Sequence, residues 1–362
     1  MKKILALVLT LMLVLSCAAF AEVDYANLKE FKIDPAEIPQ EKLDTTLYLA
    51  VSVRGLENPY IATINDGMHM FAEYLDSIGQ KYEMQVLDSQ GDSQVEVENM
   101  RAFAAAADGN AIAYADPNEN TIAYSLAEAM GESGGYLGTA WNKNDDDSPM
   151  ELDNWVIHTS PDNVVGGYNT AKNLFEAIGG EGKVFCIEGM LTNAASIGRV
   201  EGFKKALEEY PNIEVVVDDT ANWNTDEALV LVETNLAVYP DVKGIWCAND
   251  NMATGALQAL DAAGLVGKVG VAGFDANTDI VQAIADGKAT CTISSNGYLQ
   301  GGYTLAICYA VWTGLLDVAQ LPENYRLFAT PSKLINAETV EEYMAGAPAY
   351  DFSQPFFCKD DD

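Results

Sequence analysis

The chain has 362 residues, of which 49% are hydrophobic, so it is long enough to hold two domains with ordinary cores. Its 54 acidic side chains against 20 basic ones give a formal charge of -34, and such a surface repels phosphate backbones and anionic lipid. Nucleic acid is therefore excluded as a partner.

The first residues predict export from the cytoplasm. Lys2 and Lys3 precede an apolar run over residues 4–15, which has the length of a secretory signal segment and is too short to span a bilayer. An A-x-A site ending at Ala21 would release residues 1–21 as a signal peptide. A lipobox-like sequence ending at Cys17 offers the alternative that this cysteine is lipidated. Both alternatives place the mature protein outside the cytoplasm, in the periplasm or at the cell surface.

After a polar lead-in at residues 22–44, short β-rich runs alternate with helical stretches. The predicted strands form two series, at residues 45–53, 83–88, 111–116, 136–141 and 155–160, and then at residues 184–189, 213–219, 244–249, 268–275 and 289–295. Helical stretches between them include residues 62–78, 94–107, 199–210 and 225–239. This alternation is typical of parallel sheets covered by helices. Ten such units exceed one sheet of usual size, so we expect an α/β fold with two doubly wound parallel-sheet lobes.

Three positions are predicted to bound helices. Asn58 and Asp116 each precede a proline, which is the pattern of an N-cap before proline at the first helical position. Gly264 is placed to end the helix that follows Asn251. The acidic run at residues 145–147 lies in a polar insert, and we interpret it as a solvated loop rather than a metal site.

Cysteine and histidine usage indicates neither a disulfide framework nor a metal centre. Beyond the export segment the chain keeps an odd number of cysteines, which cannot pair fully within one chain: Cys186, Cys247, Cys291, Cys308 and Cys358. The first three lie in predicted strands, where a free thiol behaves as a small hydrophobe. Only two histidines occur, and no C-x-x-C or H-x-x-x-H spacing is present, so we predict no metal and no cofactor.

Polar and aromatic side chains gather where the predicted strands end. In open parallel sheets, ligands bind outside the carboxyl ends of the strands. The candidate ligand-binding residues are Arg54, Asn58, Tyr60, Asp116, Trp141, Asn142, Arg199, Trp223, Asn249, Asp275, Ser295 and Asn296. Carboxylates, amides and guanidinium groups can satisfy sugar hydroxyls in pairs, and aromatic planes pack against the C–H faces of a ring. The set therefore predicts a site for a sugar or polyol.

Each candidate also has a purely structural interpretation. Asn249 could cap a helix, Asp275 could be an ordinary turn residue, Trp223 could be exposed in a loop, and Arg199 could pair with Glu201 or another surface acid. The set is a stronger signal than its members, because all of them fall at the same end of the predicted sheets.

These same positions carry a family resemblance. The motifs are N-P-Y at residues 58–60, V-L-D-S-Q at 86–90, R-V-E-G-F at 199–203, A-N-D-N-M-A at 248–253 and V-A-G-F-D at 271–275. In order and spacing, residues 45–335 resemble the type I periplasmic binding proteins of the ribose- and galactose-binding kind. The resemblance implies that Arg199 and Asp275 touch the ligand, that Asn249 and Asp250 lie at the site, and that Trp223 stands where many relatives carry a stacking aromatic.

The sequence departs from the ribose binders after the fourth strand. Ala140, Trp141 and Asn142 stand where those proteins carry an Asp-Arg pair, so two charges are lost and a large plane is gained. This departure argues against ribose itself as the ligand. A polar insert at residues 143–154 and an acidic, aromatic tail are further differences.

The resemblance implies a Venus-flytrap molecule whose chain crosses between lobes near residues 159, 294 and 326. The expected domains are an N-terminal lobe at 45–159 plus 295–326, a C-terminal lobe at 160–294 plus 327–345, and a tail at 346–362. Its expected function is to capture a small carbohydrate in the interlobe cleft and to deliver it, as a monomer, to the membrane permease of an ABC importer.

The sequence also bears on three rival functions. Asp250 and Asp275 could suggest a glycosidase, but no Ser-His-Asp arrangement and no phosphate-binding G-x-x-x-x-G-K-[ST] loop is visible, so no catalytic residue is predicted. A sugar-sensing protein for a chemoreceptor or histidine kinase would use the same fold and pocket and stays open as an alternative. A repressor of the lactose-repressor kind would need basic residues and a helix-turn-helix in place of an export signal.

Overall fold

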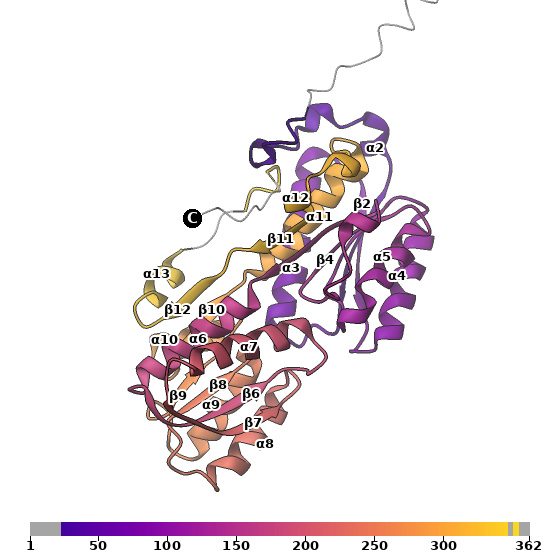
Figure 1. The fold of residues 1–362 in the computed structure, drawn as a ribbon. Coiled ribbons are helices and arrows are strands. Elements are labelled where there is room, and N and C mark those ends of the chain that lie inside the picture. The colour runs from indigo at the N-terminus through magenta and orange to yellow at the C-terminus, as the bar shows by residue number, and fades with distance from the viewer. Residues whose placement is uncertain (1–22, 347–349, 355–362) are drawn as a thin grey trace, which may run out of the picture.

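A computed structural model of the chain describes residues 23–346 and 350–354. It consists of two lobes, each built on one six-stranded sheet with helices on its faces (Figure 1). The strand orders are β11-β5-β4-β3-β1-β2 and β12-β10-β9-β8-β6-β7, and within them only β12 runs antiparallel to its neighbour. The predicted α/β fold with two doubly wound lobes is confirmed. The signal peptide, Cys17 and Cys358 lie outside the described residues.

The N-terminal lobe is the upper one in Figure 1. Its strands are β1 (Leu47–Val53), β2 (Tyr82–Asp88), β3 (Ala111–Ala115), β4 (Tyr136–Ala140), β5 (Trp155–Pro161) and β11 (Leu327–Thr330). Its helices are α2 (Gln40–Asp44), α3 (Pro59–Ile78), α4 (Ser93–Ala107), α5 (Ala123–Gly131), α11 (Gly297–Thr313) and α12 (Glu323–Arg326). β1 is buried along nearly its whole length, because helices cover both faces of a parallel sheet.

The C-terminal lobe has the same plan. Its strands are β6 (Glu181–Glu188), β7 (Asn212–Thr220), β8 (Gly244–Cys247), β9 (Gly270–Ala272), β10 (Cys291–Ser294) and β12 (Lys333–Asn336). Its helices are α6 (Asn163–Ala177), α7 (Ala194–Leu207), α8 (Thr225–Leu236), α9 (Asp250–Ala262), α10 (Thr278–Ala285) and α13 (Val340–Ala345). In the described chain, Cys186, Cys247, Cys291 and Cys308 are free and buried, as predicted for the first three.

The chain passes between the sheets after β5, after β10 and between β11 and β12. The third passage therefore falls at Pro331 and Ser332, later than the expected position near residue 326. Residues 327–330, expected in the C-terminal lobe, form a strand that pairs with β5 of the N-terminal sheet. The strand is too short to show a clear periodicity in the sequence. Only its pairing partner decides which sheet it joins.

Helix α3 shows how local sequence places the site. The Asn58 side chain accepts from the backbone N–H of Tyr60, and Pro59 takes the first helical position, as predicted. Gly301 of α11 lets the two helices approach, since a Cβ there would lie 2.1 Å from the Ile64 carbonyl oxygen. This close packing fixes the N-terminal ends of α3 and α11 beside each other.

Two predicted helix boundaries are wrong. Asp116 caps no helix: a short 3-10 turn at Asn120–Ile122 precedes α5, and the Asp116 carboxylate is buried with other partners. Helix α7 begins at Ala194, five residues before Arg199, which therefore lies in its second turn. Gly264 follows the end of α9 with a φ of 67°, as expected of a residue that ends a helix.

The lead-in and the tail pack on the N-terminal lobe. Leu28 and Ile33 of the lead-in and Phe352 of the tail are buried in the core of that lobe. The backbone N–H of Ile33 donates to the carbonyl of Ser353 at 2.6 Å, which joins the two segments. No described helix is long and apolar enough to cross a membrane.

Candidate functional site

A cavity of about 60 Å³ lies between the lobes. Roughly 10–15 Å³ of such volume holds one water, so there is space for about four to six waters. This is the size of a small polyol or one monosaccharide, and it is too small for an oligosaccharide. The lining residues are Arg54, Asn58, Tyr60, Ile61, Asp116, Trp141, Asn142, Asn193, Ala195, Arg199, Trp223, Asn249 and Asp275.

Ten of the twelve candidate residues line this cavity, and Ser295 and Asn296 do not. Ser295 is buried outside it. The Asn296 side chain accepts from the backbone N–H of Leu299 and from the hydroxyl of Tyr350, so it caps α11. The reason is that β10 ends at Ser294 and the chain turns at once into α11, so these two residues belong to the crossing between lobes.

Sequence reasoning missed three lining residues. Ile61 and Ala195 carry no polar group that could have marked them. Asn193 stands directly before α7, and an asparagine at a helix start is a recognisable signal there. The misplaced start of α7 hid it.

In the N-terminal half of the cavity, Arg54 faces Asp116 with 3.9 Å between Nη2 and Oδ1. The Asn142 amide donates to Asp116 Oδ1 at 3.1 Å and to the Pro117 carbonyl at 3.0 Å. Burial raises the pKa of Asp116, and the Arg54 cation opposes that rise. The carboxylate is thus held by one amide and one nearby cation, and keeps further acceptor positions.

Two aromatic side chains form a wall of this half. The rings of Tyr60 and Trp141 meet edge to face with centroids 5.5 Å apart. The Tyr60 hydroxyl donates to the Gln300 side chain of α11 at 3.0 Å, so it is tied to its own lobe. The wall therefore presents a rigid apolar plane and edge to the cavity.

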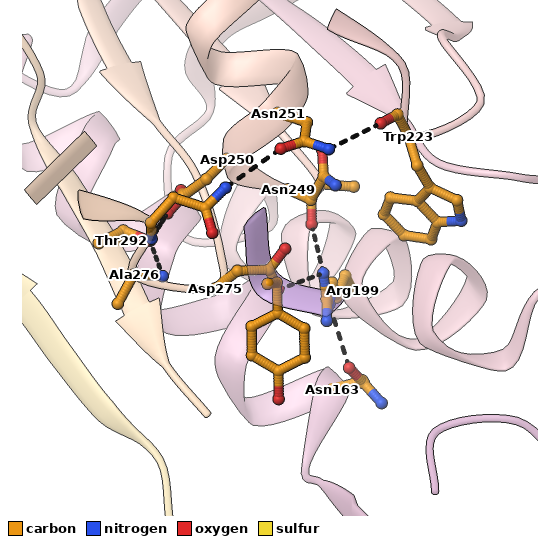
Figure 2. A network of polar contacts seen from close by, with 12 residues as sticks. Asn163, Arg199, Trp223, Asn249, Asp250, Asn251, Asp275, Ala276 and Thr292 are labelled. Carbon is orange, nitrogen blue, oxygen red and sulfur yellow. Dashed lines mark hydrogen bonds and ion pairs between the residues drawn. The ribbon is translucent and has the colours of Figure 1, made fainter. Parts of the chain in front are cut away.

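In the C-terminal half, Arg199 is the central residue (Figure 2). Its Nε donates to the Asn163 side chain at 3.1 Å, and its Nη1 donates to the Ala248 carbonyl at 2.7 Å. The guanidinium stacks 3.6 Å from the centroid of the Phe274 ring. Its side chain is only 4% exposed and it does not pair with Glu201, so the surface ion-pair interpretation is wrong.

Asp275 faces Arg199 with 3.6 Å between Oδ1 and Nη1. Burial raises the pKa of this carboxyl to about 7, although the Arg199 cation opposes the rise. The geometry is too long for a direct hydrogen bond, so both groups keep hydrogen-bonding capacity toward the cavity.

The cavity matches each cation with a carboxyl group and is rich in unpaired polar atoms. It contains two cations and two carboxyl groups, arranged as one pair in each lobe. Three buried polar atoms of the lining have no hydrogen-bond partner among the described residues: Arg54 Nε, Trp141 Nε1 and Asn142 Oδ1. Buried polar groups are normally paired, so such a cluster suits a ligand that both donates and accepts.

Three lining residues adopt backbone angles that non-glycine residues rarely take. The φ values are 66° for Trp141, 64° for Trp223 and 122° for Asp275. Strain of this kind persists only where the surroundings enforce it, and it clusters at functional sites. Here it turns two indoles and one carboxylate toward the same cavity.

The positions of Asn249 and Trp223 decide their structural interpretations. Asn249 both caps α9, by accepting from the Met252 N–H at 3.0 Å, and lines the cavity. Trp223 is partly buried and packs against the cores of both lobes, so it is not a freely exposed aromatic.

Within the described chain, one group of potential metal ligands is close enough to converge: Cys186, Glu188 and Asp218. It lies outside the cavity, on β6 and the neighbouring edge strand β7. Burial raises the pKa of the Cys186 thiol well above its ordinary value, and nearby carboxylates add to the rise. These conditions disfavour the thiolate that a metal would require.

The two lobes touch directly beside the cavity. The backbone N–H of Ala194, at the start of α7, donates to the Asn120 side chain of the N-terminal lobe at 2.8 Å. Asn193 donates to the Asn118 carbonyl at 3.4 Å. The structure is therefore a closed form, in which side chains of both lobes converge on one small volume.

Comparison with known proteins agrees with this architecture. A profile described as a periplasmic binding protein domain matches residues 49–315. The ribose import binding protein of Haemophilus influenzae is 30% identical over 285 residues, which cover 78% of this chain and 91% of that protein.

Two crystal structures are similar to this chain over most of their length. A twin-arginine translocation pathway signal protein from Burkholderia phytofirmans has a TM-score of 0.79 and 32% identity, covering 83% of this chain and 92% of its own. An ABC transporter periplasmic solute binding protein from Actinobacillus succinogenes with bound D-allose has a TM-score of 0.71 and 27% identity, covering 82% of this chain and all of its own. The chain belongs to the periplasmic binding protein family.

Proposed function

We propose that this protein captures one small neutral carbohydrate, a sugar or polyol, in the interlobe cavity and delivers it to the membrane permease of an ABC importer. The H. influenzae relative is named for ribose import, and the A. succinogenes structure holds D-allose. These names favour import over a sensory role.

The observation that carries the proposal is the polar balance of the cavity. Each lobe supplies one cation and one carboxyl group, so neither charge type is in excess in number, which fits a neutral solute better than an ion. Sugar hydroxyls donate and accept at once, so they can satisfy unpaired donors and acceptors together. Trp141, Trp223 and Tyr60 supply aromatic surface for the apolar faces of a sugar ring.

The mechanism is binding coupled to closure. Asp116, Asn142 and Arg54 belong to one lobe, and Arg199 and Asp275 belong to the other, so a ligand that bonds to all of them favours the closed form. Rotation about the three passages between the lobes opens the cavity for entry and release. We propose no covalent step and assign no catalytic residue.

The protein acts outside the cytoplasm, as its periplasmic relatives do. We propose that residues 1–21 direct export or that Cys17 anchors the chain by a lipid, that the mature protein is a monomer, and that its closed form is the one the permease recognises.

A thermal-shift screen of the mature protein tests the ligand class. The panel contains ribose, D-allose, other pentoses and hexoses, polyols and, as a contrast, amino acids. A ligand at 100 times its dissociation constant adds about 2.7 kcal/mol of stability. For a chain of this size the melting temperature would rise by roughly 5–10 °C. A rise with an amino acid and none with any sugar or polyol would contradict the proposal.

A further inference from the structure

Two buried acidic side chains, Glu96 and Asp250, lie outside the cavity, one in each lobe. Both are fully buried, and neither forms an ion pair in the described part of the chain. Each stands in the first turn of a helix, Glu96 in α4 and Asp250 in α9. Burying a carboxyl group without a cation is costly, so the contacts of each group need an explanation.

Glu96 holds the loop that follows β3. Its Oε2 accepts from the backbone N–H of Asn118 at 2.9 Å, and its Oε1 accepts from the hydroxyl of Ser52 on β1 at 3.2 Å. Asn118 stands two residues after Asp116, which lines the cavity. Glu96 is therefore bonded to the loop that presents Asp116, although it does not itself line the cavity.

Asp250 holds the corresponding loop of the other lobe (Figure 2). Its Oδ2 accepts from the backbone N–H of Asn277 at 2.8 Å, and its Oδ1 accepts from the hydroxyl of Thr292 on β10 at 2.8 Å. Asn277 stands two residues after Asp275. The Thr292 hydroxyl also accepts from the backbone N–H of Ala276 at 3.2 Å, so the whole turn is tied down.

The two arrangements are equivalent although their residues differ. In each lobe a buried carboxyl group at a helix start accepts one backbone N–H, from the second residue after the cavity aspartate. In each lobe it also accepts one hydroxyl, from a strand beside the one that precedes that aspartate in the chain. The same solution, reached with Glu and Ser in one lobe and with Asp and Thr in the other, points to a shared requirement.

That requirement is the shape of the loops. Asp275 and Ala276 both have positive φ values, 122° and 59°, which non-glycine residues adopt only when their surroundings impose them. Without the bond to Asp250, the Asn277 N–H would be a buried donor with no partner. The same holds for the Asn118 N–H and Glu96.

We propose that Glu96 and Asp250 are positioning residues, one in each lobe, which hold the Asp116 and Asp275 loops in the geometry that binds the ligand. This inference rests on the proposed function of the cavity. An apolar side chain of similar volume could fill the same space, but it would leave the Asn118 or Asn277 N–H without a partner, so the carboxyl oxygens serve the loops and not only the packing.

The protonation state of both groups shapes the test. Burial raises the pKa of Glu96 to about 8, and burial together with the Asp275 carboxylate raises the pKa of Asp250 well above its ordinary value. An amide resembles a neutral acid of this kind. Its carbonyl oxygen can accept the loop N–H, and its NH₂ can donate to the hydroxyl oxygen.

The test compares E96A and D250A with the conservative variants E96Q and D250N. The dissociation constants for ribose and D-allose are measured by calorimetry, and melting temperatures by circular dichroism. Hydrogen exchange of the Asn118 and Asn277 amides is followed by NMR on protein labelled with ¹⁵N-asparagine, which needs no ligand. T170V is the matched control, because Thr170 is a buried threonine whose hydroxyl bonds to the Trp246 indole away from the cavity.

We expect the alanine variants to bind about tenfold more weakly or worse, and the amide variants to stay within about threefold of the wild type. Hydrogen exchange should accelerate at the Asn118 amide in E96A and at the Asn277 amide in D250A. The other of the two amides should exchange at the wild-type rate in each variant. T170V should lower the melting temperature and leave the affinity unchanged. Alanine variants that fold and keep wild-type affinity, or amide variants that lose as much as alanine, would overturn the proposal.

If the alanine variants fail to fold, S52A and T292V take their place. Each removes the hydroxyl partner of one carboxyl group, so exchange should accelerate at Asn118 in S52A and at Asn277 in T292V; unchanged exchange in both would overturn the proposal. If the wild type binds neither ribose nor D-allose, the choice of ligand is wrong, and the exchange measurements still decide the positioning role.

Discussion

At the residue scale, the cavity holds oppositely charged side chains close together without direct hydrogen bonds between them. Arg199 is the clearest case: its bonds to Asn163 and to the Ala248 carbonyl hold the guanidinium in place, while Asp275 stays 3.6 Å away. A buried arginine that already has a fixed geometry loses little entropy when it bonds to a ligand. The residue is thus prepared for binding before the ligand arrives.

Replacing Arg199 should therefore abolish tight binding. R199A leaves Asp275 buried without a cation, and truncating one partner of such a pair costs about 2–5 kcal/mol, or roughly 30- to 5,000-fold in affinity. R199K keeps the charge but loses the stacked plane and one donor direction, so an intermediate loss is expected. Calorimetry with the best ligand of the screen measures both.

The matched control for these variants is R101A. Arg101 forms an exposed ion pair with Glu132 at 3.0 Å, and such pairs contribute little. Equal affinities of R199A and R101A would show that Arg199 does not contact the ligand.

The pH dependence of stability is set in part by Glu96. Its pKa rises from an ordinary value of 4.5 to about 8, chiefly by burial, while Asp116 adds to the rise and the Arg54 cation opposes it. The folded state thus holds this proton more tightly than the unfolded state. The stability it contributes is complete below about pH 4.5 and is lost as the pH rises toward 8.

In E96Q this contribution no longer titrates. The free energy of unfolding should therefore fall less steeply in E96Q than in the wild type between about pH 5 and 8. Urea denaturation at several pH values measures the slope. The Asp275 carboxyl, whose pKa is about 7, should leave a residual slope in both proteins. Identical slopes would mean that Glu96 is ionised throughout.

At the scale of elements, the start of α7 is completed by the other lobe. Its own cap residue, Asn193, makes no side-chain capping bond, and Asn120 of the N-terminal lobe accepts from the Ala194 N–H instead. This bond exists only while the lobes are together. Closure therefore satisfies a helix end that is otherwise left to solvent.

N120A should accordingly weaken ligand binding without touching the ligand, since Asn120 does not line the cavity. Removing a cap costs about 0.5–2 kcal/mol, which corresponds to a roughly 2- to 30-fold higher dissociation constant. Stopped-flow measurements should show the change mainly in the dissociation rate.

N154A is the control for this experiment. Asn154 donates to the Ala127 carbonyl at 2.6 Å within one lobe, just before β5 and so at the opposite end of the sheet from the cavity. It should lower the melting temperature and leave the affinity alone. A similar loss of affinity in both variants would remove the case for a cap between the lobes.

At the scale of the whole molecule, the ligand links two lobes that are otherwise joined by three passages of chain and a few direct contacts. A ligand can shift the open and closed populations only by its difference in affinity for the two forms. The closed form offers both ion pairs at once, whereas an open form would offer one lobe at a time.

Small-angle X-ray scattering should therefore show a smaller radius of gyration with saturating ligand than without it. In R199A, which loses a contact from one lobe, the radius should stay at the unliganded value at the same ligand concentration. A radius that is unchanged by ligand in the wild type would mean that the free protein is already closed in solution.

Much of the fold was predictable because its signals are local. All ten predicted strands are present, and their edges shift by only a few residues. The short strands β11 and β12 were missed, because four residues carry too little periodicity to identify them. The proline rule was right at Asn58 and wrong at Asp116, where the side chain is engaged by Asn142 instead of a helix N–H.

The sequence by itself determined the alternation of strands and helices, the division into two lobes and ten of the residues that line the cavity. These follow from hydrophobic patterning and from the rule that parallel strands end at one edge. The tertiary structure alone decided that Asn193 lines the cavity, that Ser295 and Asn296 do not, and that Glu96 and Asp250 hold the loops. The reason is physical: these outcomes depend on contacts between segments far apart in the chain, such as Ser52 with Glu96, which no local pattern records.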